Sequence, residues 1–150
     1  MILAIGQRIA YRLKAIRTMT IDNDALLKQA MTVRERAYAG YSRYYVGVAL
    51  LDEKGNVHVG CNVENTAFPQ SSCAEANAIG AMVAAGGRRI AKIAVVGGSG
   101  DMEPCTPCGG CRQRIKEFAD QGTRIITLDA DGFPVVHTMD DLLPVSTQPV

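Results

Sequence analysis

The sequence predicts a mixed α/β domain, in which helices flank a single sheet. Segments with helical and strand patterns alternate along the chain in the order α-β-β-α-β-α-β-β. The chain of 150 residues is 47% hydrophobic and 21% charged, which is typical of a soluble globular protein with a substantial core. We therefore expect one domain over residues 19–150, preceded by a short extension of residues 1–18.

The extension is basic and amphipathic. It contains Arg8, Arg12, Lys14 and Arg17 but no acidic residue, and aliphatic side chains recur in it at helical spacing. This pattern predicts a basic amphipathic helix. We interpret it as an N-terminal extension ahead of the domain; the alternative is a helix that binds a membrane surface or a partner.

The first helix of the domain is expected to begin at a cap formed by Asp22 or Asn23 and to run to about Ala39. Gly40 ends it. Apolar residues recur on one face of this segment, namely Ala25, Leu26, Ala30, Val33 and Ala37.

A β-hairpin follows. Residues 46–51 form an apolar run typical of a buried strand, residues 52–56 have turn composition, and residues 57–63 return as the second strand. Residues 64–72 are polar and aromatic and are expected to form a loop.

The next two elements are a helix and a strand. An alanine-rich helix is expected over residues 73–85, closed by the pair Gly86-Gly87. The strand covers residues 90–96, and residues 97–107 form a loop.

The C-terminal part contributes four shorter elements. We expect a helix over residues 109–120, strands over residues 124–129 and 132–137, and a short helix over residues 140–143 that Pro144 closes.

Two short motifs together predict a zinc site. Cys73-Ala74-Glu75 and the later Pro107-Cys108-Gly109-Gly110-Cys111 supply three sulfur ligands and one carboxylate. A catalytic zinc is held by three protein ligands and keeps its fourth position for water. Cys73 and Cys108 also fall at predicted helix starts, where free backbone N–H groups favour a thiolate. Glu75 is then placed to move protons to and from that water.

The remaining cysteines leave an alternative open. Cys105 precedes Cys108 by three residues and could supply a fourth sulfur, which would make a closed, structural site. Cys61 is interpreted as a small buried side chain. Three thiolates on Zn²⁺ carry a net negative charge, so Arg112 and Arg114 are candidate donors to the sulfur atoms.

Charge and cysteine usage exclude several classes of protein. The formal net charge of +1 gives no electrostatic case for a nucleic-acid partner. No apolar run approaches the roughly 20 residues that span a bilayer, so no membrane partner is expected. An odd number of cysteines with a Cys-x-x-Cys pair favours metal binding in a reducing cytoplasm over a disulfide framework.

Several ordered motifs resemble those of the small zinc-dependent cytidine deaminases that act on free nucleosides. They extend over residues 41–144 and comprise Tyr41-Ser42-x-Tyr44-x-Val46-Gly47, Gly60-Cys61-Asn62-Val63-Glu64-Asn65, Cys73-Ala74-Glu75, Pro107-Cys108-Gly109-Gly110-Cys111-Arg112-Gln113 and Leu142-Leu143-Pro144. The resemblance implies a three-layer α-β-α fold with a five-stranded mixed sheet. It also implies one zinc per chain and a homotetramer with active sites at the subunit boundaries.

The resemblance implies roles for individual residues. Glu75 would be the proton shuttle, and Asn62 and Glu64 would bind the ribose hydroxyls. The zinc ligands would be Cys73, Cys108 and Cys111. Tyr44 would stack on the base, and Phe68 would approach a neighbouring subunit's site. The backbone N–H of Ala74 or Cys73 would hold the base carbonyl.

The function implied is hydrolytic deamination of cytidine and 2′-deoxycytidine to uridine and 2′-deoxyuridine, as in pyrimidine salvage. Three positions depart from the family pattern: Ala76 replaces an arginine, Tyr45 a proline and Thr147 a late phenylalanine. The alternative substrate is therefore a related aminopyrimidine nucleoside, a free base or a nucleoside antibiotic. Two further classes are a nucleic-acid deaminase, which the charge disfavours, and a non-catalytic zinc module, which would need Cys105 as a fourth ligand.

Overall fold

A five-stranded mixed sheet organises the protein. The computed structural model describes residues 21–146, so the predicted extension of residues 1–18 and Thr147 lie outside the described residues. The sheet order is β2-β1-β3-β4-β5, and only β3 and β4 pair in parallel; the strands are β1 (Tyr45–Asp52), β2 (Val57–Cys61), β3 (Ile90–Gly98), β4 (Arg124–Leu128) and β5 (Pro134–His137). The predicted hairpin is confirmed as the antiparallel pair β1 and β2.

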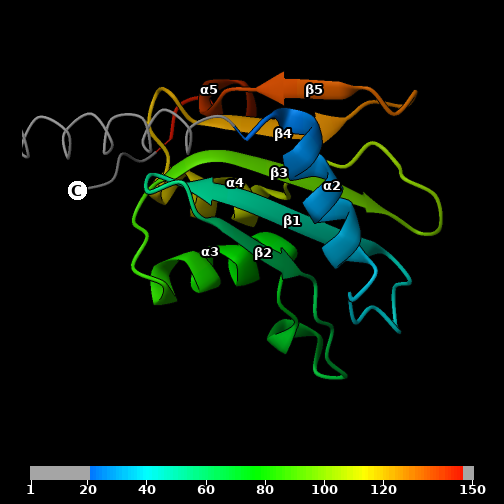
Figure 1. Cartoon of the computed structure of the whole chain (residues 1–150). Helices are drawn as coiled ribbons and strands as arrows, with labels where there is room; N and C mark the ends of the chain where they lie inside the picture. Colours follow the sequence, from blue (N-terminus) through cyan, green and yellow to red (C-terminus); the bar gives the residue numbers. More distant parts are fainter. Residues whose placement is uncertain (1–20, 147–150) are drawn as a thin grey trace, which may run out of the picture.

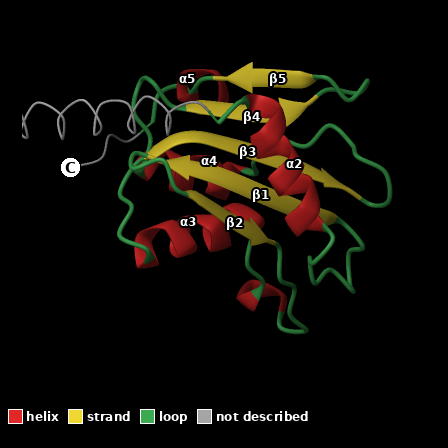
Figure 2. Ribbon diagram, viewed as in Figure 1, coloured by secondary structure: helices red, strands yellow, loops and turns green. Residues whose placement is uncertain are grey.

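Helices cover both faces of the sheet (Figure 1). One face carries α2 (Asn23–Arg34), whereas α3 (Ala74–Ala84) and α4 (Gly109–Glu117) lie side by side on the other (Figure 2). The short helix α5 (Met139–Leu142) joins the second layer, where Met139 and Leu142 pack into the same core as α3 and α4. The predicted three-layer α-β-α fold is thereby confirmed.

Alternating strand residues form the two halves of the core. Val48 and Leu50 of β1 pack under α3 and α4, whereas Ala49 between them packs under α2. Successive side chains of a strand point to opposite faces. The continuous apolar run in β1 therefore reflects a strand that is buried on both faces.

The first helix is shorter than predicted. It begins at the Asp22 cap, whose carboxylate accepts a hydrogen bond from Ala25 N at 2.7 Å, but it ends at Arg34 rather than near Ala39. The chain leaves the helix because Tyr38 pairs with the segment after β2: Tyr38 N donates to Asn62 O at 3.0 Å, and Glu64 N donates to Tyr38 O at 2.8 Å.

Strand β2 and helix α4 also end two or more residues earlier than predicted. Strand β2 ends at Cys61, because Val63 pairs with Ser72 across the following loop. Helix α4 ends at Glu117, and the carbonyl of the next residue, Phe118, accepts a hydrogen bond from Ile90 N. The loop after β2 contains one unpredicted 3₁₀ turn, η1 (Phe68–Gln70).

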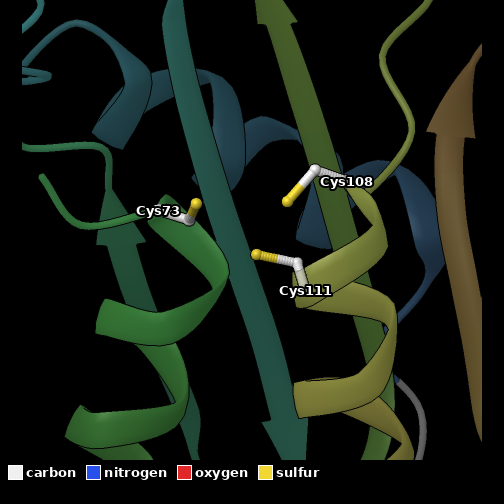
Figure 3. A group of neighbouring side chains, drawn as sticks. All are labelled: Cys73, Cys108 and Cys111. Carbon is white, nitrogen blue, oxygen red and sulfur yellow. The ribbon is translucent and has the colours of Figure 1, made fainter. Parts of the chain in front are cut away.

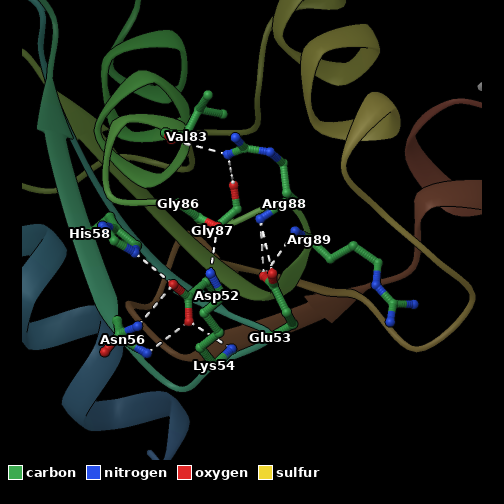
Figure 4. A network of polar contacts seen from close by, with 10 residues as sticks. All are labelled: Asp52, Glu53, Lys54, Asn56, His58, Val83, Gly86, Gly87, Arg88 and Arg89. Atoms are coloured by element: carbon green, nitrogen blue, oxygen red, sulfur yellow. Dashed lines mark hydrogen bonds and ion pairs between the residues drawn. The ribbon is translucent and has the colours of Figure 1, made fainter.

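A buried carboxylate at the C-terminal end of β1 holds the β1–β2 turn together (Figure 4). Asp52, which is only 2% exposed, accepts hydrogen bonds from Lys54 N and Asn56 N, and its other oxygen lies 2.8 Å from His58 Nε2. The neighbouring Glu53 accepts hydrogen bonds from the backbone of Arg88 and Arg89, in the connection that follows α3. This network therefore fixes the C-terminal end of α3 relative to the hairpin.

Over residues 21–146, no helix is long and apolar enough to cross a membrane.

Candidate metal centre and adjoining cavity

Three cysteine sulfur atoms converge between the N-termini of α3 and α4 (Figure 3). Cys73 is the N-cap of α3, Cys108 is the N-cap of α4, and Cys111 lies in the first turn of α4. The three Sγ atoms all lie within 4.8 Å of one another. Two helix N-termini, with their positive dipole ends, thus face the same point as the three sulfur atoms.

The donor set fits a zinc ion. In a tetrahedral zinc–thiolate site with bonds of about 2.3 Å, the sulfur atoms are about 3.8 Å apart, so the cluster needs little adjustment. Cys105 is not part of the cluster, because its buried side chain packs against Gly97 and the ring of Tyr44. Cys61 is half-buried on β2. The described residues therefore offer three sulfur atoms in one cluster, and a zinc ion bound by them would keep its fourth position for water.

Glu75 lies beside the cluster. Glu75 is 4% exposed in the first turn of α3, close enough to influence the Cys111 thiol. Burial raises the pKa of the Cys111 thiol, and the nearby charges of Glu75 and Cys73 raise it further. Burial acts in the same direction on Cys108, but hydrogen bonds from the Cys111 backbone N–H and from the Cys111 and Cys73 side chains together outweigh it, so the pKa of Cys108 is lowered. Burial and the neighbouring Glu75 and Cys73 groups thus oppose negative charge on the Cys111 sulfur.

The two candidate arginines have different contacts. Arg114 Nη1 donates to Cys111 Sγ at 3.8 Å. Arg112 instead donates to Pro107 O and Leu142 O, each at 2.8 Å, and so ties the loop before Cys108 to the end of α5. Of the two candidate donors named from the sequence, Arg114 contacts a sulfur atom of the cluster and Arg112 contacts backbone carbonyls.

A cavity of about 450 Å³ opens beside Cys73. Two predicted ribose-binding residues line it. Asn62 is held by the start of β1, since its amide donates to Tyr44 O at 2.9 Å and accepts from Val46 N at 2.8 Å. Glu64 accepts hydrogen bonds from Tyr41 N at 2.8 Å and Ser42 N at 3.2 Å, and the Ser42 side chain is the main cause of its lowered pKa. The other lining residues are Tyr41, Ser42, Phe68, Ser71, Ser72 and Cys73.

The predicted aromatic contacts divide between the core and the cavity. Phe68 is 69% exposed at the cavity mouth and meets Tyr41 in an edge-on contact, with ring centroids 5.8 Å apart. Tyr44 does not line the cavity. Its half-buried ring packs against Cys105, and burial, with the Cys105 contact, raises its pKa to about 12. Tyr41 was not among the predicted site residues, although the motif that begins with it was a signal for this cavity.

The first turn of α3 is positioned by Gly60 of β2. A Cβ atom on this residue would lie 2.4 Å from Ala78 N and 2.5 Å from Ala74 O. Only a glycine allows the helix to lie so close to the strand. Ala74, which carries the backbone N–H predicted to hold the substrate, is fully buried in this contact. The close packing sets the distance between the sheet and the helix start that bears Cys73 and Glu75.

The fold and the site define an α/β enzyme that uses a three-cysteine zinc centre with a buried carboxylate. Residues 20–127 match the family described as the cytidine and deoxycytidylate deaminase zinc-binding region. The chain therefore belongs to the zinc-dependent cytidine and deoxycytidylate deaminase family, and the predicted zinc cofactor and deaminase class are confirmed.

Individual relatives match over most of the chain. Cytidine deaminases of Sporosarcina psychrophila and Halalkalibacterium halodurans are 38% and 37% identical, over 83% of this chain and 90% and 92% of their own lengths. The crystal structure of cytidine deaminase from Burkholderia pseudomallei has a TM-score of 0.77 at 39% identity and covers 85% of this chain and 100% of that one. The corresponding structure from Mycobacterium leprae has a TM-score of 0.71 at 38% identity, over 83% and 99%.

Proposed function

We propose that the protein deaminates cytidine and 2′-deoxycytidine, forming uridine and 2′-deoxyuridine and releasing ammonia. The observation that carries this proposal is the position of Cys73. It belongs both to the sulfur cluster and to the lining of the cavity that contains Asn62 and Glu64. A nucleoside whose sugar is held by those two residues can therefore direct its base toward the metal centre. The cytidine deaminases described above support the same substrate class.

The chemistry divides between the metal and the protein. Cys73, Cys108 and Cys111 would hold a zinc ion, which when bound would supply an acidified water molecule as the nucleophile. Glu75 accepts a proton from this water and delivers it to N3 of the base, while the water oxygen bonds to C4. Glu75 then moves the second water proton to the exocyclic amine. The C4–N bond breaks, ammonia leaves and the C4 carbonyl forms.

The burial of Glu75 suits it for this double role. A carboxylate that acts first as a base and then as an acid works best where bulk water is excluded. Glu75 lies at the start of α3, next to Cys111 and Ala74. We assign the Ala74 backbone N–H to the carbonyl oxygen at C2 of the base, because it points from the first turn of the same helix.

Sugar recognition falls to two pre-oriented side chains. The Asn62 amide uses one donor position on Tyr44 O and one acceptor position on Val46 N, and it keeps one of each for a hydroxyl. The Glu64 carboxylate is fixed by the backbone of Tyr41 and Ser42. Since the lowered pKa keeps it ionised at neutral pH, it is an acceptor for a ribose hydroxyl. We further assign Tyr44, whose ring packs against Cys105, to stacking on the base.

We further propose that the protein is a homotetramer whose active sites lie at subunit boundaries. Exposed apolar side chains lie on the edge strand β2, at the bridge between Tyr38 and Val63, and in the lining of the cavity. They are Tyr38, Tyr41, Val59, Val63 and Phe68, each between 42% and 69% exposed. Such a patch is typical of a subunit interface, and it would place Phe68 toward a neighbour's cavity. Light scattering should give four times the chain mass.

We place the protein in the cytoplasm, where thiol ligands stay reduced, and its reaction in pyrimidine salvage.

A panel of free nucleosides and bases, assayed by ammonia release, tests the proposed reaction. We expect turnover of cytidine and 2′-deoxycytidine. Glu75→Gln should keep the zinc and the fold but lower kcat at least about 1000-fold, because it removes the proton shuttle. The matched control is Glu117→Gln, the same change at the exposed end of α4. Turnover of another amine with neither cytidine nor deoxycytidine accepted would replace the substrate, and near-normal activity of Glu75→Gln would remove its role.

A further inference from the structure

The proposed zinc centre has an excess of negative charge. Three thiolates on Zn²⁺ leave a net charge of −1. The buried Glu75 carboxylate adds to it, and Cys111, one of the three ligands, is 0% exposed. An uncompensated negative charge away from water is costly, so a nearby cation would stabilise the metal-loaded state.

Arg114 is positioned to provide that cation. It follows Cys111 by three residues on α4, so the two side chains lie on the same face of the helix. Its Nη1 atom donates to Cys111 Sγ at 3.8 Å, within the range for a hydrogen bond to sulfur. Gly110 leaves room for the guanidinium, because a Cβ atom there would lie 3.2 Å from Nη1.

The other cations near the centre are committed elsewhere. Arg112 donates hydrogen bonds to Pro107 O, Leu142 O and the Thr106 hydroxyl. Lys116, on the same helix as Arg114, lines a different cavity together with Thr138 and Asp140. Within residues 21–146, Arg114 is the one basic side chain with a hydrogen bond to a sulfur atom of the cluster.

We propose that Arg114 is a positioning residue of the zinc centre. Its positive charge offsets the excess negative charge of the metal–thiolate group, and its hydrogen bond holds the Cys111 sulfur turned toward the metal. This inference rests on the proposed zinc ligands and does not depend on the identity of the substrate. Partners of metal ligands typically change metal affinity about 10- to 100-fold. Because Arg114 is open to solvent on its outer side, we expect the lower end of that range.

The test measures zinc retention without substrate. Zinc-loaded protein is mixed with an excess of a chromophoric chelator, and the rate of zinc transfer is compared among variants. Arg114→Gln should release zinc about tenfold faster than the wild type. Arg114→Lys, which keeps the charge, should restore part of the difference. Lys116→Gln removes the same charge from the same helix and should behave as the wild type.

Two further measurements separate this role from a structural one. The wild type must first bind about one zinc per chain, since failure there would reject the zinc ligands and not Arg114 in particular. The zinc-free forms of the wild type and Arg114→Gln should unfold at the same temperature, and their difference in zinc release should shrink at high salt. Equal zinc release by the wild type and Arg114→Gln would overturn the proposal. The proposal would also be overturned if the zinc-free Arg114→Gln protein were less stable than the zinc-free wild type and Arg114→Lys retained zinc no better than Arg114→Gln.

Discussion

Gly60 of β2 and Ala78 of α3 are in such close contact that a Cβ atom on Gly60 would lie 2.4 Å from the Ala78 nitrogen. This contact is backbone against backbone and cannot be relieved by a change of rotamer. It lies one helical turn beyond Ala74, whose neighbours Cys73 and Glu75 carry the proposed chemistry. The metal centre thus depends on a glycine that touches neither the metal nor the substrate.

Replacing Gly60 by alanine should therefore damage both stability and activity. The added methyl group must push α3 away from the sheet, which we expect to lower the free energy of unfolding by about 2 kcal/mol. Because Cys73 moves with the helix while Cys108 does not, zinc retention should fall as well. Urea unfolding and zinc content measure the two effects.

Gly80 provides the matched control. It lies in the same helix, but a Cβ atom there would meet nothing within 4 Å. Gly80→Ala should stabilise the protein by up to about 1 kcal/mol, because alanine favours a helix more than glycine does. If both substitutions proved equally neutral, Gly60 would not control the position of α3.

The cysteines divide into ligands and a core residue, and substitution distinguishes them. Cys108→Ala removes one of the three clustered sulfur atoms, so we expect loss of zinc and of activity together. Cys105→Ala removes a buried sulfur packed on Tyr44, so we expect a loss of about 1 kcal/mol in stability but a full complement of zinc. Metal analysis of the two purified variants checks this. Loss of zinc from Cys105→Ala would restore the closed, four-sulfur alternative.

The sequence predicted the elements well and their ends less well. Hydrophobic runs and glycine pairs identified the strands and α3, because burial and turn conformation are local properties. The early end of α2 at Arg34 was missed, since it depends on Tyr38 pairing with Asn62 and Glu64, which lie more than twenty residues away. The residues around Arg34 and Tyr38 carry no local sequence pattern that predicts this long-range backbone pairing.

The candidate site shows the same division. The spacing of Cys73, Cys108 and Cys111 was enough to predict the sulfur cluster, because each lies at a helix start. The sequence could not predict that Arg114, and not Arg112, donates a hydrogen bond to sulfur. Arg112 donates to Leu142 O instead, and that hydrogen bond can form only when α5 packs beside α4.

Arg34 should hold the loop that leads toward Cys108. Its guanidinium donates to Tyr45 O at 3.1 Å and, through Nη2, to Gly98 O and Gly100 O at 2.8 Å. Lysine keeps the charge but lacks the planar fork, so Arg34→Lys should cost about 1 to 2 kcal/mol of unfolding free energy. We also expect faster amide hydrogen exchange in residues 98–104, measured by mass spectrometry. Arg36→Lys, at an exposed position two residues on, should change neither quantity; equal effects of the two would contradict the assignment.

The buried Asp52 should make stability depend on pH in the acid range. Burial alone would raise its pKa, but hydrogen bonds from His58, Asn56 and Lys54 outweigh burial and lower it. The stabilisation is therefore fully present above the ordinary aspartate pKa of about 4 and is lost as the pH falls through the lower folded value.

The substitution Asp52→Asn isolates this contribution. Zinc loss at low pH affects the wild type and the variant alike, so the difference between their unfolding free energies reports on Asp52. We expect that difference to be largest at about neutral pH and to shrink as the pH is lowered below about 4. Denaturant unfolding at a series of pH values measures it, with the exposed Asp131→Asn as control. A difference that stays constant across this range would show that the Asp52 charge does not stabilise the folded turn, and that only its shape matters there.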